Sequence, residues 1–481
     1  AGRIARAIHP DRVRQLTFTA TDTNNPAHLR LRTQMRAYAE AMGLRSLYSM
    51  ALRDGKLVFG PESLDPNDPY ASAPGTVYEN PSPMDFEVFQ TGQANVQGPR
   101  TDEYGSFVSA LAPVIDPRTG EVLMAVGIDL ETPMWKTAVR RTQLIVIEIL
   151  ILLFVVLAAG ALAVRVRQRY TVRRHPLLIY AETAVCALIL LIATVVAARL
   201  THQAEERERT ESFRFLAQAR AAAYSQTFSY LRNELNMLSG FFNSSEHVSG
   251  SEFNSYCRPL VDSRLIQACL WIPSVSSAEI NVFTDKTRAE ELHGFSIWEP
   301  GPDGSPAPAA ERDIHYPVLY VEPRDDHQRL TGYDMSSDPL RRSAIDAALQ
   351  TGHPAACDPV TLFAAPGSPR GFVVFQPASN AGQTGTVGMG IVPEAIIQRH
   401  AHASENAEMT VSASLYHLAP GRPPLWLACS RGCSHLHDRA ALRHATHESM
   451  PVFIFGQVFE VLIGPEPEWL ATHPLRRWIA T

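Results

Sequence analysis

Two long apolar segments separated by a short basic turn constrain this chain more than any other feature. Residues 142–164 read TQLIVIEILILLFVVLAAGALAV, and residues 176–198 read PLLIYAETAVCALILLIATVVAA. About 20 helical residues cross a hydrocarbon core of about 30 Å, so each segment is long enough to span a membrane. The turn between them, residues 165–175, is rich in arginine, which marks the cytoplasmic side. The sequence therefore predicts a transmembrane helical hairpin at residues 141–199.

This hairpin places both large flanking regions, residues 1–140 and 200–470, on the periplasmic or extracellular side. We therefore expect a multi-pass protein of the inner or plasma membrane, in contact with the lipid bilayer. Glu148 and Glu182 interrupt the apolar segments near opposite membrane faces, and we interpret both as interfacial rather than as one site. Residues 471–481 end in LRRWIAT, a basic and aromatic sequence typical of a membrane boundary, so we expect a further membrane helix after them.

The composition argues against several classes of function. A formal net charge of −6 over 481 residues, with arginines concentrated beside the apolar segments, gives no reason to expect a nucleic-acid partner. A chain of this length is too long to fold around one hydrophobic core, so more than one domain is expected. The sequence contains no P-loop, GxSxG or HExxH motif, and we predict no catalytic residue and no cofactor in this chain.

The N-terminal region has the pattern of a small α+β domain. Residues 1–40 are helical in pattern, with breaks at two Pro-containing sites. Strands are predicted at residues 46–52 and 56–59 around an Asp-Gly pair, which is a strong hairpin signal. A second hairpin is predicted from residues 107–115 and 122–130, with a Pro- and Gly-containing turn between them.

Part of this region resembles a known family. The segments ASAPGTVYEN and TGQANVQGPRTDEYGSFVSALAPVIDPRTGEVLMAVGIDLE resemble, in that order, the membrane-proximal half of Cache (PDC-type) extracellular sensor domains. The resemblance covers residues 30–131 and is most specific from Asp102 to Asp129. It implies a PAS-like sheet with a small-molecule pocket on one face, and it makes Tyr104 and Asp129 candidate ligand-binding residues. It also implies a longer N-terminal helix than this sequence contains.

Residues 200–240 predict a long helix that continues from the second apolar segment without Pro or Gly until Gly240. Apolar residues recur along it at spacings of four and three, namely Tyr224, Phe228, Leu231, Leu235 and Leu238. This spacing fits a helix that packs on its own domain, and its period of about 3.5 residues also fits a seam between two copies. Both alternatives stay open from the sequence, and we expect a homodimer.

The rest of the second region alternates strands with helices, which predicts an α+β fold with two subdomains. Strands are expected at 265–272, 314–321, 372–376, 386–392, 408–416 and 451–463, and helices at 337–350 and 393–401.

This second region resembles the CHASE sensory domain. The segments LIQACLWIPSV, HYPVLYVEP, LTGYDMSSDPLRRSAIDAALQTGHPAACDPVTLF, GFVVFQPAS and FEVLIGPEP match that family in content and order, over residues 200–470. CHASE domains occur outside the membrane on sensor histidine kinases and nucleotide cyclases. The resemblance implies a long stalk helix, a membrane-distal PAS-like subdomain that holds the ligand, and a smaller proximal subdomain.

The resemblance also implies which residues line the distal ligand pocket. Carried over by position, they are Tyr320, Glu322, Cys357, Phe363 and Phe375. Pro323 stands where the plant cytokinin receptors of this family present an Asp, and Cys357 stands where they present a Thr. A cytokinin ligand is therefore not expected, although a different small molecule is. We expect Asp334 to organise a turn rather than to bind a ligand.

A cysteine-containing run offers either a metal site or a disulfide. Cys429 and Cys433 stand with His435, His437 and Asp438, and such thiols and imidazoles would suit zinc. No second ligand pair lies at a standard spacing, and three intervening residues outside the cytoplasm suit a local disulfide or free surface thiols. We therefore predict no metal site.

Together these patterns predict the sensory portion of a transmembrane receptor that binds small molecules. The expected output, beyond residue 481, is a two-component sensor histidine kinase, with a diguanylate cyclase as the alternative. A periplasmic binding or transport accessory module would carry similar pockets without an effector domain. An extracytoplasmic enzyme would need a convergent acid, base or nucleophile in one cleft.

Overall fold

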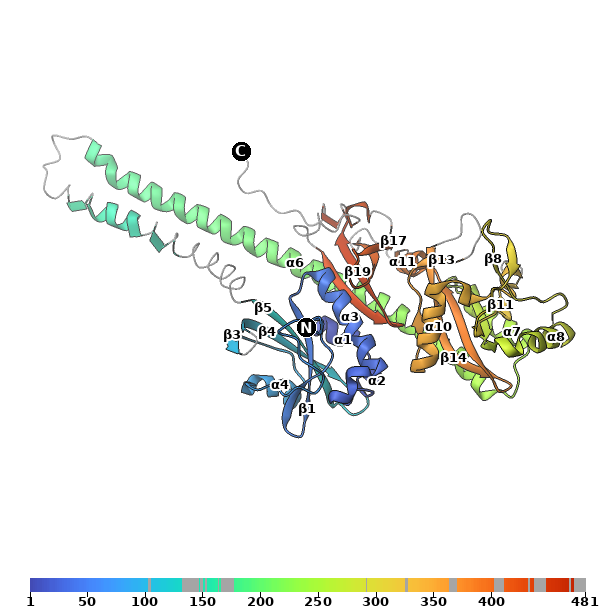
Figure 1. The fold of residues 1–481 in the computed structure, drawn as a ribbon. Helices are drawn as coiled ribbons and strands as arrows, with labels where there is room; N and C mark the ends of the chain where they lie inside the picture. The colour runs from blue at the N-terminus through green and yellow to red at the C-terminus, as the bar shows by residue number, and fades with distance from the viewer. Residues whose placement is uncertain are drawn as a thin grey trace.

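Helix α6 (Leu177–Ser244) connects the predicted membrane region to the C-terminal half of the chain. It is 68 residues long and projects far beyond the three largest sheets of the molecule in Figure 1. The predicted domain boundary at residue 200 therefore falls inside one continuous helix. The computed structural model describes residues 1–102, 105–131, 147, 150–151, 154–162, 164–165, 177–290, 292–324, 328–362, 370–401, 411–430, 433–436, 447–466 and 469–470.

The N-terminal region is an α+β unit in which helices precede one antiparallel sheet, here called the N-terminal sheet. Its elements are α1 (Gly2–Ala7), α2 (Pro10–Val13), η1 (Ala20–Asn24), α3 (Pro26–Met42), β1 (Ser46–Arg53), β2 (Lys56–Phe59), α4 (Pro83–Thr91), β3 (Asn95–Asp102), β4 (Gly105–Ile115) and β5 (Val122–Glu131). The strand order is β2-β1-β5-β4-β3. The predicted helices and both predicted hairpins are confirmed, whereas α4 and β3 were not expected.

Short polar and glycine residues set the ends of these elements. The Asn25 side chain accepts a hydrogen bond from the Ala27 amide at the start of α3, and Gly43 ends that helix with a φ of 64°. The first hairpin turns at Asp54 and Gly55, whose φ angles of 48° and 76° suit a two-residue turn.

The two faces of the N-terminal sheet have different neighbours. Leu47 and Ala51 of β1 point into a core that they share with α1, α2 and α3. Met50 and Phe59 belong to a second, smaller cluster on the other face, against which Tyr48 packs. A ligand pocket on this sheet therefore has to lie on the face away from α1–α3.

The C-terminal region begins with a distal subdomain built on a second antiparallel sheet, here called the distal sheet. Its elements are α7 (Gly250–Asp262), β6 (Ile266–Pro273), β7 (Val275–Ser276), η3 (Ser277–Glu279), α8 (Ile280–Glu290), β8 (Trp298–Pro300), β9 (Pro306–Pro308), β10 (Ile314–His315), β11 (Tyr320–Glu322), η4 (Gln328–Leu330), η5 (Met335–Ser337), α10 (Pro339–Thr351), β12 (Ala355–Ala356), β13 (Val360–Thr361), β14 (Arg370–Asn380) and β15 (Gln383–Ile391). The sheet order is β11-β6-β15-β14-β12, with β13 beside β14.

The apolar stripe of α6 packs against this region of the same chain. Its residues Tyr224, Phe228, Leu231, Leu235 and Leu238 are each at most 3% exposed and belong to one core cluster. Phe242, one turn further on, stacks on Trp271 of β6 with ring centroids 4.6 Å apart. Of the two alternatives that the spacing left open, packing on its own domain is the one that this stripe adopts.

A proximal subdomain completes the fold. It contains α11 (Pro393–Ala401), β16 (Val411–Leu418), β17 (Leu425–Cys429), η7 (Cys433–Leu436), β18 (Glu448–Ile454) and β19 (Gln457–Pro465). The strands form the proximal sheet, in the order β17-β16-β19-β18. Two strand predictions need correction: residues 451–463 are not one strand but parts of β18 and β19, and residues 314–321 are divided between β10 and β11. The β18–β19 turn is at Phe455 and Gly456, both with positive φ.

The N-terminal region and the proximal sheet share one hydrophobic core. Leu31, Met35 and Tyr38 of α3 lie in the same buried cluster as Phe453 of β18 and Leu462 of β19. The rings of Tyr38 and Phe453 meet edge to face with centroids 6.1 Å apart. The two regions are thus packed together, as Figure 1 also shows.

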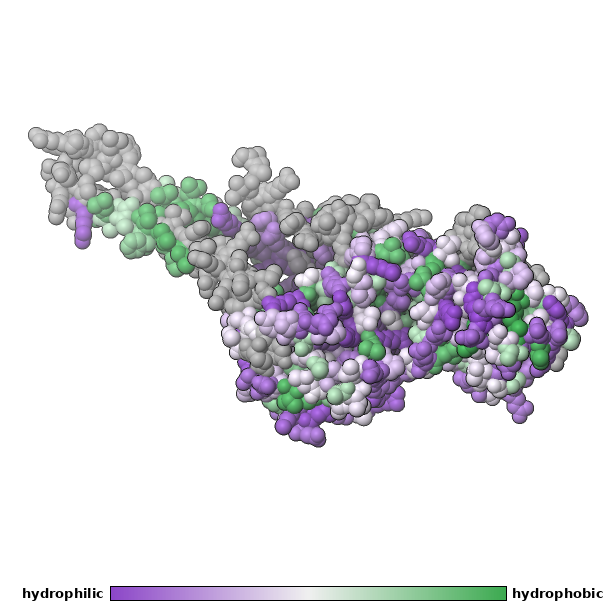
Figure 2. Space-filling model, viewed as in Figure 1, coloured by the Kyte–Doolittle hydropathy of each residue, from purple (hydrophilic) through white to green (hydrophobic). Residues whose placement is uncertain are grey.

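Within the described residues, one helix is long and apolar enough to cross a membrane, and none of its most apolar 18-residue window is buried. Leu190 and Leu191 of α6 are 68% and 61% exposed, and apolar side chains cover the projecting arm in Figure 2. Residues 154–162 are also helical, with Phe154 72% exposed. Glu148 and the side chain of Glu182 lie outside the described residues, so the two-helix hairpin stays a prediction.

Candidate functional site

A small cavity opens on the N-terminal sheet, on the face away from α1–α3. Its volume is about 50 Å³. It is lined by Arg45, Ser46, Tyr48, Met50, Phe59, Glu62, Leu64, Tyr70, Ser72, Tyr78, Phe107 and Asp129. We call it the N-terminal pocket. Aromatic walls with a few converging polar groups are typical of small-molecule sites.

Tyr48 and Asp129 face each other across paired strands in this pocket. The Tyr48 hydroxyl donates a hydrogen bond of 3.0 Å to Asp129 Oδ1. The Tyr48 ring lies over Gly127 of β5, where a Cβ atom would come within 2.3 Å of the ring, so glycine is required there. Burial, and then the Asp129 charge, raise the pKa of Tyr48 far above its usual value. Tyr48 therefore stays a neutral donor that orients the carboxylate.

Arg45 and Glu62 add further charge to the pocket. The Arg45 guanidinium lies 5.1 Å from the centroid of the Tyr70 ring and 5.4 Å from that of Phe107. The Ser72 amide donates a 2.7 Å hydrogen bond to Glu62 Oε1. Burial raises the pKa of Glu62 to about 7, although the Ser72 bond acts in the opposite direction. Glu62 is thus partly protonated near neutral pH.

The pocket therefore brings a carboxylate, a guanidinium and aromatic rings around one small space. An ammonium group would complement Asp129, and a carboxylate would complement Arg45. Asp129 was predicted from the Cache resemblance and lies in this pocket. Tyr104 lies outside the described residues. Tyr48, Arg45 and Glu62 were missed, although Tyr48 could have been found because it alternates with the buried positions of β1.

In the distal subdomain, two predicted residues lie on the edge strand β11. Tyr320 pairs with Trp271 of β6, and its ring lies 5.7 Å from that of Phe253 on α7. Glu322 is 4% exposed and lies 3.5 Å from the Arg258 guanidinium of α7. Both side chains therefore face α7 rather than α10.

Tyr320 also lines an open groove of about 430 Å³ between α7 and β11. The groove residues are Ser249, Gly250, Ser251, Asn254, Leu292, Leu319, Tyr320, Val321, Arg324 and Thr331. Glu322 does not line it.

Cys357 and Phe375 lie at the opposite edge of the distal sheet, in the packed core. Phe375 is fully buried and pairs with Ala355 of β12 and Gly388 of β15. The Cys357 sulfur accepts a hydrogen bond from the Val373 amide at 3.3 Å, and burial raises the pKa of Cys357 to about 11. The structure does not bring these two residues together with Tyr320, and Phe363 lies outside the described residues.

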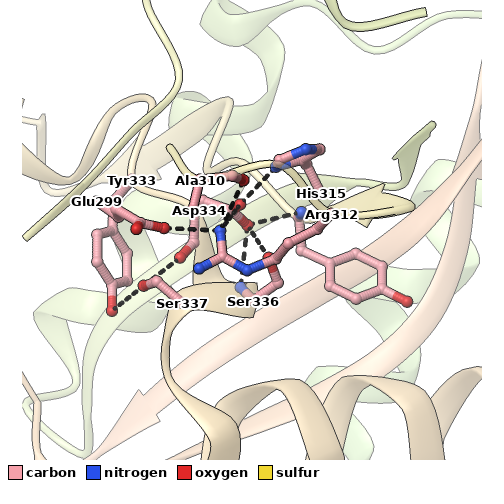
Figure 3. A network of polar contacts seen from close by, with 9 residues as sticks. Glu299, Ala310, Arg312, His315, Tyr333, Asp334, Ser336 and Ser337 are labelled. Carbon is pink, nitrogen blue, oxygen red and sulfur yellow. Dashed lines mark hydrogen bonds and ion pairs between the residues drawn. The ribbon is translucent and has the colours of Figure 1, made fainter. Parts of the chain in front are cut away.

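Asp334 organises the turn into η5, as predicted, and it also lies at the centre of a buried polar network, whose geometry Figure 3 shows. Its carboxylate accepts hydrogen bonds from the Tyr316 and Ser336 amides at 2.9 and 3.0 Å, and it lies 2.7 Å from His315 Nδ1. Burial acts to raise the pKa of Asp334, but hydrogen bonds from Ser336, Tyr316 and His315 outweigh it and keep the pKa below its usual value. Both carboxylate oxygens of Asp334 interact with groups of the protein itself, which fits a structural role.

Cys429 and Cys433 form a disulfide, which is one of the two states predicted for an unmetallated pair. The neighbouring His435 side chain, His437 and Asp438 lie outside the described residues. Among the residues that the structure describes, no cluster of His, Cys, Asp and Glu is arranged to hold a metal ion.

Comparison with known proteins supports part of the sequence interpretation. Residues 246–422 match the family model of the CHASE domain, which confirms that resemblance for the distal subdomain and the start of the proximal one. No curated protein shows significant sequence similarity to the chain.

Solved structures of receptor domains are also similar to the chain. An extracellular ligand-binding receptor from Desulfohalobium retbaense is 11% identical over 52% of this chain, with a TM-score of 0.32, and the match spans 40% of that receptor. The ligand-binding domain of the Pseudomonas aeruginosa chemoreceptor PctC, in complex with GABA, is 13% identical over 52% of this chain and 98% of its own, with a TM-score of 0.28. The extracellular domain assigned to the histidine kinase mmHK1S-Z3 is 12% identical over 56% of this chain and 97% of its own, with a TM-score of 0.33.

Proposed function

We propose that this chain is the ligand-sensing outer and transmembrane portion of a signalling receptor. The observation that carries the proposal is the continuity of α6. The helix begins in an exposed apolar segment and ends against the core of the region that matches the CHASE family. A ligand that prefers one packing of the distal sheet on α6 would bias the position of the helix in the membrane.

The N-terminal pocket would bind a small molecule that carries an ammonium group, with an amino acid as the simplest candidate. Support comes from Asp129, oriented by Tyr48, and from Arg45 among aromatic rings. A desolvated ammonium–carboxylate pair contributes strongly to affinity and selects against neutral analogues.

Asp129→Asn tests this site. A thermal-shift screen of amino acids and simple amines should find a ligand that stabilises the wild-type chain, and the variant should bind it at least about tenfold more weakly. Asp54→Asn, at an exposed hairpin turn, serves as the matched control and should keep wild-type affinity. Equal affinity in wild type and Asp129→Asn would contradict the proposed contact.

A second ligand is proposed for the distal subdomain, with Tyr320 and Glu322 of β11 as contacts. The open groove supports the Tyr320 contact, whereas the Glu322 contact is carried over from the CHASE resemblance. Contacts at Cys357, Phe363, Phe375 and Tyr104 remain predictions from the two resemblances. The ligand would be neither a cytokinin nor a nucleic acid.

We also propose the hairpin topology, with spans at residues 142–164 and 176–198. Its support is the core shared by the N-terminal region and the proximal sheet. Two regions that pack together lie on the same side of a membrane, so the chain between them must cross it an even number of times. Single cysteines at position 170 (Tyr170→Cys) and position 54 (Asp54→Cys) test this in intact cells. A membrane-impermeant maleimide should label position 54 only, and labelling of both positions would contradict the hairpin.

The proposed output is a histidine kinase in a homodimeric receptor, with a diguanylate cyclase as the alternative. The gene sequence after residue 481 separates these outputs. A His-box with an ATP-binding domain supports the kinase, a GGDEF domain supports the cyclase, and an immediate stop codon would favour a binding module without output.

A further inference from the structure

Three arginines from three different helices gather where the N-terminal region meets the C-terminal region. They are Arg12 of α2, Arg30 of α3 and Arg232 of α6, of which Arg30 and Arg232 act electrostatically on Arg12, and we call them the arginine cluster. Arg12 Nη1 donates a 2.9 Å hydrogen bond to Oε1 of Gln34, a residue of α3 that is 1% exposed. Gln34 Nε2 in turn donates a 2.7 Å bond to the carbonyl of Gln457 in β19. The Arg12 side chain is thereby fixed at the boundary between the two regions.

The other contacts of the cluster also cross this boundary. Arg30 lies four residues before Gln34 on the same face of α3, and its guanidinium donates to the carbonyl of Pro354, which follows α10. The neighbouring His353 ring contacts the Gln15 side chain just after α2. Gly456, in the β18–β19 turn, lies so close that a Cβ atom there would be 2.5 Å from Arg30 Nε.

The charges of the cluster outnumber the acidic groups that face them among the described residues, where Asp11 acts on Arg232. In the described part of the chain, none of the three arginines forms an ion pair with a carboxylate. Asp11 is the acid that faces the cluster, but its carboxylate already contacts Arg14 and, at 3.7 Å, Arg118. Uncompensated charges are costly when they are withdrawn from water, and their mutual repulsion adds to that cost.

The electrostatics agree with this geometry. Burial, and then the charges of Arg30 and Arg232, lower the pKa of Arg12 to about 9. Burial lowers the pKa of Arg30 to about 10. The pKa of His353 is lowered by burial and then by Arg30 and Arg12, and that of His9 by burial and then by Arg232, against the opposite effect of Asp11. The neighbouring arginines therefore disfavour the charged forms of Arg12, His353 and His9.

We propose that the arginine cluster is a binding site for a small oxyanion, either phosphate or a carboxylate. Guanidinium groups present planar, paired N–H donors that match phosphate and carboxylate oxygens. Each of the three residues keeps part of its surface exposed to solvent. Because the arginines come from α2, α3 and α6, a bound anion joins the N-terminal region to the stalk helix. This site is independent of the proposed N-terminal pocket and uses none of its residues.

Thermal unfolding of the full chain in detergent tests the site, with inorganic phosphate and succinate each compared with chloride at equal ionic strength. The wild-type chain should gain several degrees in Tm with at least one of the two anions, in proportion to the logarithm of its concentration. A response to phosphate alone or to succinate alone identifies the class of anion. A wild-type chain that responds to neither overturns the proposal.

Arg232→Gln is the decisive variant, because Arg232 makes no hydrogen bond with any residue that the structure describes. This variant should lose the anion-dependent gain while its Tm in chloride stays equal or rises, since a repulsive charge has been removed. Arg207→Gln, at an exposed position of the same helix, should keep the full gain. Arg12→Gln should behave like Arg232→Gln if it folds. An unchanged anion response in Arg232→Gln overturns the proposal whether or not Arg12→Gln folds.

Discussion

The N-terminal sheet and the distal sheet are both antiparallel and both belong to regions that resemble sensor domains, yet they differ in what covers their second face. The N-terminal sheet packs one face on α3 and presents Tyr48 and Asp129 on the other, around a cavity. The distal sheet packs against α6 and α7 on one face and α10 on the other, and its predicted residue Phe375 is fully buried. The structure therefore shows an open pocket beside the predicted residue Asp129, whereas the predicted residue Phe375 lies in a packed core.

Of the variants that test this difference between the two sheets, Phe375→Ala should lower the unfolding free energy most. Removing a fully buried ring from a packed core costs about 3–5 kcal/mol of unfolding free energy. We expect calorimetry of the full chain to show a lower Tm for the C-terminal region, while ligand binding at the N-terminal pocket is retained. Phe375→Leu, which keeps most of the volume, should lose much less. A Phe375→Ala chain of normal stability would instead indicate a pocket wall and would make the two sheets alike.

Glu62→Gln should stabilise the chain at high pH, because it removes a buried carboxylate from the N-terminal pocket. The pKa of Glu62 is raised to about 7 in the fold, so the folded state holds a proton that the unfolded chain has lost. Stability therefore falls as pH rises from about 4.5 to about 7 and stays low above that window. The variant lacks this loss and should be about 2–3 kcal/mol more stable than wild type at pH 8.

The control for this experiment is the pH dependence of the same difference. Below the unfolded pKa, near pH 4, the carboxyl group is protonated in both states and the advantage of Glu62→Gln should vanish. Glu87→Gln, at an exposed position on α4, should show no comparable difference at either pH. A gain that is equal at both pH values would mean that burial of the charge is not its cause.

Tyr48→Phe should have a smaller effect, restricted to the N-terminal pocket. It removes the hydroxyl that donates to Asp129, a hydrogen bond to a charged group, and should cost about 1–2 kcal/mol of stability or of ligand affinity. Calorimetry and ligand titration together separate the two contributions. Tyr70→Phe, in the same pocket, is the matched aromatic control. Wild-type stability and wild-type affinity in Tyr48→Phe would show that Asp129 needs no orienting donor.

Much of the fold could be predicted because it depends on local signals. Asn25 and Gly43 bound α3, Asp54-Gly55 turns the first hairpin, and the stripe from Tyr224 to Leu238 marks the buried face of α6. The β18–β19 turn at Phe455–Gly456 was missed, because an apolar run that continues through a turn looks like one strand.

The site was harder to predict, because a pocket is made by contacts between distant segments. Glu62 becomes unusual only because it is buried against the Ser72 amide, and the sequence around it reads as a surface loop. The arginine cluster combines Arg12, Arg30 and Arg232, which are far apart in the sequence and have no shared motif. Asp129 lies within the segment that resembles Cache domains and was therefore predicted, whereas Tyr48 is placed in the pocket by strand register.

Arg214→Gln should change the unfolding free energy least. It tests whether an ion pair holds the N-terminal region against the C-terminal region. Glu448 of β18 contacts Arg3 of α1 and lies 3.2 Å from Arg214 of α6, so it links the N-terminal region to the stalk helix. Both arginines are about half exposed, 42% and 53%, and solvent screens such pairs to less than about 1 kcal/mol. We expect Arg3→Gln, Arg214→Gln and the double variant to lower the unfolding free energy by less than about 1 kcal/mol, and the two regions should still unfold together.

Phe453→Ala is the control, because it removes a ring from the shared core and should lower the unfolding free energy several times more. If the Arg214 and Arg3 variants separated the two regions while Phe453→Ala did not, the charged bridge rather than the apolar core would be what couples one sensor region to the other.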